Sequence, residues 1–312
     1  MLLKDARFYQ ILFLGLFLLL GIGTRDWTLH PEMVGVLIAT CLLTQWGMGW
    51  IIGCGSWRGW RQAMGDGQQA TEHLESPVPP APGASLPSAL ITSLGLSLLL
   101  RTDHYSTVIL AGTLAILSKF LLRVRGKHLF NPANFGIIAA LLLTRDAWVS
   151  PGQWGEEGWY VLLFLGTGGV VLRKVGRWDT TVAFLGAYAG LEAIRNVWLG
   201  WTWDVWAHRL MSGSLLLFAL FMITDPRTIP NARVGRLLWA IAIALLTFIL
   251  RNVFFIPTAV FWALFALAPL TPLLDFIFPA DRFSWSSSRP SGATSKAVGV
   301  GTPPVTSTPF VS

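Results

Sequence analysis

Residues 123–136, RVRGKHLFNPANFG, place a cluster of basic side chains directly before a proline-led apolar segment. The apolar segment, Pro132–Leu143, is too short to cross the hydrocarbon of a bilayer, for which a helix needs about 20 residues. Proline at the first helical position needs no N–H partner, and Asn131 before it is a good N-cap. The stretch therefore predicts a helix that begins at membrane depth, as broken or re-entrant helices do where backbone lines a cavity.

The composition of the whole chain agrees with a membrane protein. Of its 312 residues, 53% are hydrophobic and 12% are charged, and the mean hydropathy is +0.57. Soluble chains are about 25% charged, so a soluble enzyme, a disordered chain and a fibre are disfavoured. The net charge of +7 fits basic residues in cytoplasmic loops better than a nucleic-acid partner. The two cysteines, Cys41 and Cys54, are too few for a disulfide framework or a four-thiolate metal site.

Ten apolar stretches, some of them too short to span, predict an all-α polytopic protein with about ten transmembrane helices. The stretches are Phe8–Ile22, Met33–Ile52, Pro87–Leu100, Tyr105–Leu122, Pro132–Leu143, Trp159–Leu172, Thr180–Trp198, Val205–Ile223, Val234–Leu250 and Pro257–Phe278.

The basic residues test this count. With the N-terminus inside and alternating spans, 17 of the 23 lysines and arginines fall on the inner side. A wrong number of spans would scramble this bias, so the pattern predicts an inner-membrane, multi-pass protein with both termini in the cytoplasm.

An internal repeat divides the spans into five plus five. Leu98–Asp103 resembles Leu220–Asp225, and Pro132 and Pro257 follow at a nearly constant offset. Because each half has an odd number of spans, the second half must be inverted, with Thr102 and Asp103 outside and Thr224 and Asp225 inside. Inverted repeats place their site near the midplane, where the two halves meet.

The predicted domain organisation follows from this repeat. A membrane domain, residues 1–280, consists of halves 1–150 and 151–280, and residues 53–86 form a cytoplasmic Pro-rich loop. Residues 281–312, rich in Ser, Thr and Pro, are expected to be disordered.

Two groups of residues are the candidate cofactor site. Asn131, Pro132 and Asn134 form one half-helix mouth, whose N–H groups and partial positive charge suit a flavin phosphate or a quinone carbonyl. A capped helix without a ligand is the other interpretation. The two Thr-Asp corners complete the site; its further members are Thr102, Asp103, Thr224, Asp225 and Pro226. No catalytic residue, triad, phosphate loop or metal cluster is identified.

Four motifs resemble the membrane subunit shared by the Rnf and Na⁺-translocating NADH:quinone oxidoreductase complexes, the RnfD/NqrB family. They are Phe130–Ala133, Leu210–Gly213, Phe221–Pro226 and Gly235–Leu237. The resemblance covers roughly residues 9–278. It implies a ten-helix inverted repeat, other subunits of a redox complex as partners, and bound FMN, often covalently attached to a threonine. Electron transfer coupled to ion translocation is the activity that it implies.

The chain departs from the family at the flavin-bearing loop. The family has an Ala-Thr-Pro-Leu-like segment between the fifth and sixth spans. In this chain the corresponding loop, Thr144–Gly158, contains no Ala-Thr pair, and Thr144 is its only threonine. FMN or riboflavin is therefore expected to be non-covalent, with quinone as another possible ligand. A flavinylation-like string in the tail offers Thr294 as a remote acceptor, for which coincidence is the favoured interpretation.

Other polar residues have structural interpretations, and alternative functions stay open. Glu192 and Arg195 lie three apart and can pair on one helix face, and Lys119 can snorkel from the end of its span. A non-redox channel or transporter for a small solute or ion, and a scaffold that needs partner subunits, are the alternatives to a redox subunit.

Overall fold

The computed structural model describes residues 6–24, 30–65, 86–150 and 158–283, and this part of the chain is helical apart from short connections. The predicted all-α polytopic membrane fold is confirmed. Thr294, the Pro-rich part of the predicted loop and nearly all of the predicted tail lie outside the described residues.

The first half of the chain forms five helices and four two-residue strands. These are α1 (Ala6–Thr24), α2 (Pro31–Gly65), α3 (Leu86–Leu99), β1 (Leu100–Arg101), α4 (Tyr105–Leu121), β2 (Arg123–Val124), β3 (Lys127–His128), α5 (Pro132–Leu143) and β4 (Trp148–Val149). The strands pair as β1 with β4 and β2 with β3, both antiparallel, and close the ends of the helices beside them.

The described part of the second half is also helical, and two of its helical segments are broken. Its elements are α6 (Gly158–Val175), α7 (Trp178–Trp198), α8 (Trp203–Leu210), α9 (Gly213–Leu217), the π-helical turn η3 (Phe218–Met222), α10 (Arg233–Asn252), α11 (Ala259–Leu267), the 3₁₀ turn η4 (Ala268–Leu270) and α12 (Thr271–Ile277). Each of the ten predicted stretches is thus one helix or one broken helix.

The breaks have local causes. α8 and α9 meet at 52° around Ser212. α11 ends where Pro269 and Pro272 each remove a backbone donor and interrupt regular α-helix. Short and broken helices were predicted for this fold, and such breaks are tolerated in membranes where neighbouring protein satisfies the freed backbone groups.

Helix length sets which elements can cross a bilayer unaided. Among the described residues, four helices are long and apolar enough, namely α1, the first part of α2, α10, and α11 with α12; the bent pair of α8 and α9 with η3 makes a fifth. α3, α4 and α5 are apolar but shorter. The total of about ten crossings stays a prediction.

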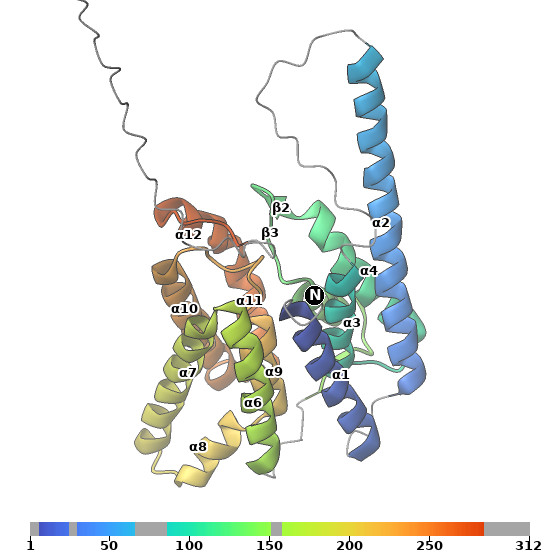
Figure 1. The fold of residues 1–312 in the computed structure, drawn as a ribbon. Helices are drawn as coiled ribbons and strands as arrows, with labels where there is room; N and C mark the ends of the chain where they lie inside the picture. The colour runs from blue at the N-terminus through green and yellow to red at the C-terminus, as the bar shows by residue number, and fades with distance from the viewer. Residues whose placement is uncertain (1–5, 25–29, 66–85, 151–157, 284–312) are drawn as a thin grey trace, which may run out of the picture.

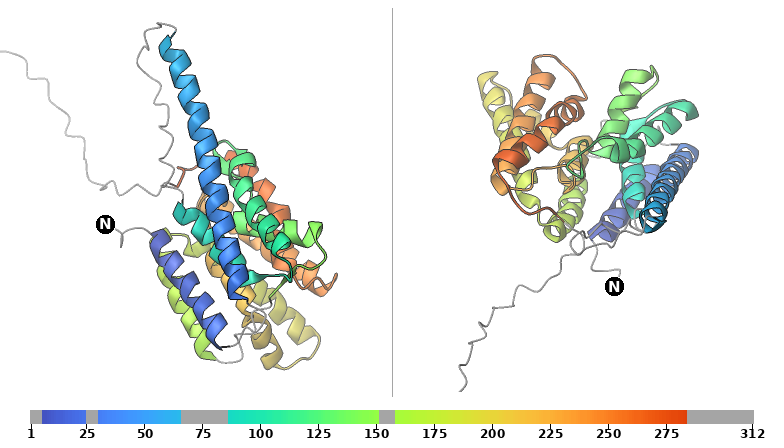
Figure 2. Two further views of the ribbon diagram at one scale, coloured as in Figure 1. Left: turned by 90° about the vertical axis from the view of Figure 1, so that its right-hand side faces the viewer. Right: turned by 90° about the horizontal axis from the view of Figure 1, so that it is seen from above.

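The two halves pack in matched ways. α2 packs along α4 as α7 packs along α10, and α4 packs on α5 as α10 packs on α11. Between the halves, α1 contacts α6 and α5 contacts α11, so each of these contacts joins elements in corresponding positions. Seen from above in Figure 2, the blue-to-green half and the yellow-to-red half lie side by side.

One predicted boundary is wrong. The cytoplasmic loop was expected to begin at residue 53, but α2 continues as helix to Gly65 and rises beyond its neighbours in Figure 1. Its glycines disfavour helix, whereas the preceding long apolar span provides a helical nucleus, and extending a helix costs far less than starting one.

Small residues allow the close helix contacts of the first half. A Cβ atom added to Gly136 of α5 would lie 2.8 Å from the carbonyl oxygen of Ala111 and 2.9 Å from Cβ of Ala115, both in α4. Close backbone approach of this kind is how helices associate in lipid, where packing replaces the hydrophobic effect.

We therefore expect Gly136→Ala to destabilise the protein by about 1–3 kcal/mol, because backbone cannot move aside as a side chain can. Gly186 of α7 is the control, since a Cβ there would meet nothing within 4 Å. Gly186→Ala should leave stability unchanged or raise it slightly. Thermal unfolding in detergent measures both; equal melting temperatures for the two variants would contradict the close contact between α4 and α5.

Candidate functional site

Asn131 caps the N-terminal end of α5, which we call the mouth of this helix. The backbone of Asn131 is extended, with φ −64° and ψ 125°, and its Oδ1 accepts a hydrogen bond from the N–H of Asn134 at 3.1 Å. Its Nδ2 donates to the carbonyl of Met222 at 3.2 Å. Asn131 is the predicted N-cap, and the same side chain also attaches the mouth to the second half of the chain.

Asn134 makes a second link across the halves. Its Nδ2 donates to the carbonyl of Phe261 in α11 at 3.1 Å, and the side chain is only 1% exposed. Its Oδ1 is enclosed and has no hydrogen-bond partner in the protein. A buried acceptor without a partner costs about 1–3 kcal/mol, so the burial of this oxygen is unfavourable in the protein alone.

The Thr-Asp-Pro joint, which is the connection Thr224–Pro226 after η3, lies against this mouth. Asp225 Oδ1 accepts from the N–H of Arg227 at 3.1 Å, and its Oδ2 lies 3.5 Å from Asn131 Nδ2. Burial raises the pKa of Asp225, and the N–H of Arg227 partly offsets that effect. Thr224 instead donates to the carbonyl of Leu220 at 3.0 Å, and Pro226 is buried. Of this joint, Asp225 is therefore the residue whose side chain approaches the mouth.

Two further residues next to the mouth were missed as site members. Lys119 is 4% exposed and donates to the carbonyl and the hydroxyl of Ser88 at 3.1 and 3.3 Å, so the expectation that it snorkels is wrong. The positive charge of Lys119 lowers the pKa of Asp225 and so opposes the effect of burial. His128 is buried beside them, and its ring donates to the carbonyl of Lys119.

His128 supplies a second buried acceptor. Burial, reinforced by the charges of Arg123, Arg227 and Lys119, lowers the pKa of His128 to about 3. The imidazole is therefore neutral at physiological pH. Its Nδ1 has no hydrogen-bond partner and carries a lone pair, because the other ring nitrogen holds the proton.

An ion pair and several hydrogen bonds beside the mouth connect the first half of the chain to the second. Lys127 Nζ forms an ion pair with Asp275 Oδ2 at 2.8 Å and donates to Asn231 Oδ1 at 3.2 Å and to the carbonyl of Ile229. The N–H of Asn231 donates to Asp275 Oδ1 at 2.7 Å. Lys127 and Asn231 lie in connections that the distribution of basic residues predicts to be on the inner side of the membrane. These two connections thus meet at one end of the molecule.

Thr102 lies at the opposite end of α5. Its hydroxyl donates to Asp146, just beyond the C-terminus of α5, and the same carboxylate accepts from Thr107 Oγ1 at 2.9 Å. Asp146 also lies 3.1 Å from His104 Nδ1. The bond from Thr102 is the main cause of a pKa of Asp146 well below its usual range. Asp103 is exposed and takes no part in this cluster.

The eight predicted residues therefore form two groups rather than one. Asn131, Pro132, Asn134 and the joint around Asp225 meet at the N-terminal mouth of α5, and Thr102 belongs to the far end. Sequence similarity between the Thr-Asp pairs could not show that Asp146, rather than Asp103, would supply the carboxylate there.

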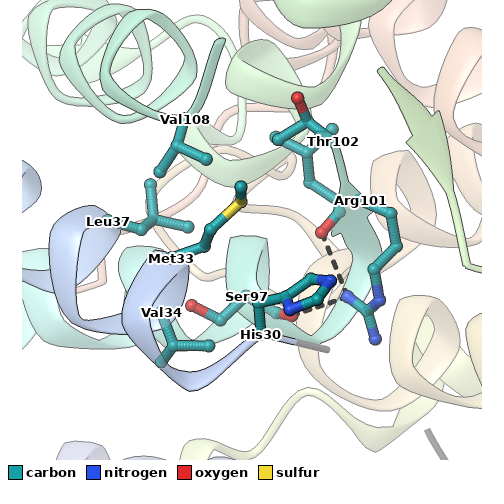
Figure 3. A pocket seen from close by; sticks show the side chains of 9 residues that line it. His30, Met33, Val34, Leu37, Ser97, Arg101, Thr102 and Val108 are labelled. Atoms are coloured by element: carbon teal, nitrogen blue, oxygen red, sulfur yellow. Dashed lines mark hydrogen bonds between the residues drawn. The ribbon is translucent and has the colours of Figure 1, made fainter. Parts of the chain in front are cut away.

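A small cavity lies beside Thr102. It is lined by His30 and Met33 at the start of α2, by Ser97 and Arg101, and by apolar side chains around them (Figure 3). The Arg101 guanidinium donates to the carbonyls of Ser97 and Leu100 at 2.8 and 3.0 Å. With a volume of about 30 Å³ the cavity has room for a water molecule and not for a flavin ring.

The mouth of α5 offers few N–H donors to a flavin phosphate. Pro132 has no N–H, Asn134 N–H is bonded to Asn131 Oδ1, and Phe135 N–H donates to the carbonyl of Asn131 at 2.9 Å. Among the side chains of the mouth, the buried atoms without partners are acceptors, Asn134 Oδ1 and His128 Nδ1. They fit a group that donates hydrogen bonds, such as an imide N–H or a hydroxyl.

Fold and site together define an all-α polytopic membrane protein whose polar interior lies where a broken helix of one half meets a short helix of the other. The NQR2, RnfD, RnfE family profile matches residues 148–284. This region is thus similar to that family, which supports the resemblance found in the sequence.

Named relatives agree with this assignment. They are the D subunits of ion-translocating oxidoreductase complexes. The chain is 35% identical over 126 residues to the relative from Stutzerimonas stutzeri, covering 40% of this chain and 35% of that protein. The relative from Alcanivorax borkumensis is 32% identical over 44% of this chain and 41% of its own length. That of Erwinia tasmaniensis is 28% identical over 58% and 45%. The matched region thus spans less than half the length of each of these relatives.

The double role of Asn131 generates a prediction. Asn131→Ala should destabilise the protein by about 1 kcal/mol or more, because it removes the helix cap and the link to Met222. Asn131→Ser retains a capping oxygen and loses the link alone, so it should lie between Ala and the unsubstituted protein in melting temperature. If Ser is no better than Ala, the cap contributes nothing measurable here.

The buried neutral His128 predicts a pH dependence. Its pKa is lower in the folded than in the unfolded chain, so unfolding takes up a proton as pH falls below about 6.5. Stability is therefore fully present above that pH and declines progressively from there toward pH 3. His128→Gln should flatten the fall in melting temperature between pH 6.5 and 5, whereas the control His208→Gln, at an exposed position, should not; an unchanged slope in His128→Gln would contradict burial of the neutral ring.

Proposed function

We propose that this protein is a membrane subunit of an Rnf-type ion-translocating oxidoreductase complex, in which it carries electrons and works with other subunits. One observation carries the proposal: the region that matches the family contributes the joint at residues 222–226, and this joint closes on the mouth of α5. The relatives are named as the D subunits of such complexes, which supports partner subunits for this chain.

We propose further that the ten helical segments are an inverted repeat of five plus five in the inner membrane, with both termini cytoplasmic. Matched helix packing in the two halves supports the repeat. The placement of Thr102 and Asp225 at opposite ends of α5 supports the inversion. In corresponding connections, after α4 and after α10, Arg125 and Phe255 both adopt positive φ, 51° and 56°.

The ligand that the α5 mouth favours is a flavin ring without a contact to phosphate there, or a quinone in its reduced form, held non-covalently. Such a group would supply the capacity to take up and release electrons. Asn134 Oδ1 and His128 Nδ1 would accept its hydrogen bonds, while Lys119 and Asp225 provide opposite charges that can respond when the charge of the ligand changes.

The second candidate is a non-redox channel or transporter. The lack of an Ala-Thr pair in residues 144–158 favours it, as does the small number of N–H donors that the α5 mouth offers to a phosphate. In that case the buried acceptors at the mouth would face a solute or ion rather than a cofactor. A scaffold that acts only through partner subunits is the third.

The absorption spectrum of the purified protein separates these functions. Oxidised flavin gives a yellow protein, and Asn134→Leu should lose most of the colour because it removes an acceptor without exposing the site. Asp225→Ala should impair electron transfer or assembly with other subunits, whereas Asp103→Asn, at an exposed position, should change neither.

A colourless protein that binds no added quinol and moves a solute into liposomes would contradict the redox proposal. Full activity and assembly of Asp225→Ala would contradict the site.

A further inference from the structure

The end of the second half that carries α8 contains a buried carboxylate with several cationic neighbours. Glu192 of α7 is almost fully buried, and its Oε2 accepts from Arg209 Nη1 at 3.0 Å. Its Oε1 accepts from Asn252 Nδ2 at 2.8 Å, and Arg209 also donates to Asn252 Oδ1 at 2.9 Å. Glu192 thus pairs with Arg209 and not, as the spacing suggested, with Arg195.

Two arginines of this end have no carboxylate partner among the described residues. Arg195 stacks its guanidinium on Trp201, with Cζ 4.7 Å from the ring centroid, and its Nη1 is enclosed without an acceptor. Arg251 donates to the hydroxyl of Tyr188 at 3.3 Å. Arg209 also lies over Trp201, with Cζ 5.5 Å from the ring centroid, so Trp201 contacts two guanidinium groups, of which only that of Arg209 pairs with Glu192.

Exposed aromatic side chains surround these arginines. Trp201 and Trp203 precede and begin α8, Trp198 is 86% exposed at the end of α7, and Phe254 and Phe255 lie three and four residues after Arg251. Tryptophan and other amphipathic aromatics concentrate where bilayer hydrocarbon meets headgroups. The half-buried cations Arg195 and Arg251 therefore lie within an apolar rim at that depth.

We propose that this arginine–tryptophan cluster, formed by Arg195, Arg209, Arg251, Trp198, Trp201 and Trp203, binds the headgroup phosphate of an anionic phospholipid. The two arginines without carboxylate partners supply the charge that a phosphate complements, and guanidinium groups bind phosphate oxygens through parallel N–H bonds. The aromatic rim would contact the glycerol and the upper acyl chains.

The geometry favours a lipid over a protein partner at this surface. The guanidinium groups of Arg195 and Arg209 lie on the ring of the exposed Trp201, so an anion bound by them would lie beside the aromatic rim that is expected at the bilayer interface. Asp204, in the first turn of α8, is the other acidic residue of this surface, and it is exposed. The cluster shares no residue with the mouth of α5, so this inference does not rest on the proposed function.

Native mass spectrometry on the full chain, released from nanodiscs of equal parts phosphatidylglycerol and phosphatidylcholine, tests the proposal. The unsubstituted protein should retain phosphatidylglycerol preferentially. The double variant Arg195→Gln/Arg251→Gln should lose this preference, with affinity falling about fivefold for each arginine removed. A control double variant, Arg145→Gln/Arg173→Gln, removes two exposed arginines elsewhere and should retain it.

Equal retention of both lipids by the unsubstituted protein would overturn the proposal, as expected if the rim only anchors the protein or faces another polypeptide. Unchanged phosphatidylglycerol retention in Arg195→Gln/Arg251→Gln would also overturn it. Circular dichroism and the melting temperature of each variant show that a loss of lipid does not come from unfolding.

Discussion

α5 is a helix of 12 residues, about 18 Å long, in a protein whose apolar segments must match about 30 Å of hydrocarbon. Both of its ends therefore lie where backbone polar groups cannot rely on water, and protein groups must satisfy them. Asn131 caps the first turn and bonds to Met222, Asn134 bonds to Phe261, and Thr144 N–H bonds back to Ala140. The shortness of α5 is what makes the two halves depend on one another.

The arrangement of the remaining polar groups follows from this constraint. At the α5 mouth, Lys119 and Asp225 bring opposite charges into a region where a lone charge would be costly. Lys127 and Asp275 fasten the adjoining connections outside it. At the C-terminal end of α5, the carboxylate of Asp146 accepts hydrogen bonds from the hydroxyls of Thr102 and Thr107. The polar cross-links are thus concentrated at the helix ends, and the helices between them pack through residues such as Gly136 and Ala115.

Much of this architecture could be predicted from the sequence because apolar segments and their proline and asparagine boundaries are local features. The start of α5 at Pro132 was predicted to the residue, since N-cap and N1 preferences act within one turn. The breaks in the eighth and tenth segments were not placed, and the helical extension to Gly65 was missed, because both depend on neighbouring structure.

The site was harder to predict than the fold. Asp146, Asp275 and Phe261 approach their partners through contacts between residues far apart in the chain, and no local pattern marks them. Lys119 resembled an ordinary lysine at a helix end, and only its position opposite Ser88 makes it buried. Spacing did bring Asn131 and Asp225 forward as candidates, and they do meet. It could not show that two buried side-chain acceptors at the mouth, Asn134 Oδ1 and His128 Nδ1, would remain without partners.

The central claim is that the corners at Thr102 and Asp225 open toward opposite sides of the membrane. Single cysteines at the exposed neighbours, Asp103→Cys and Arg227→Cys, in a background without Cys41 and Cys54, can be labelled in intact cells with a membrane-impermeant maleimide. We expect position 103 to react from outside, and position 227 to react only after the membrane is permeabilised. Reaction of both positions from the same side would contradict it.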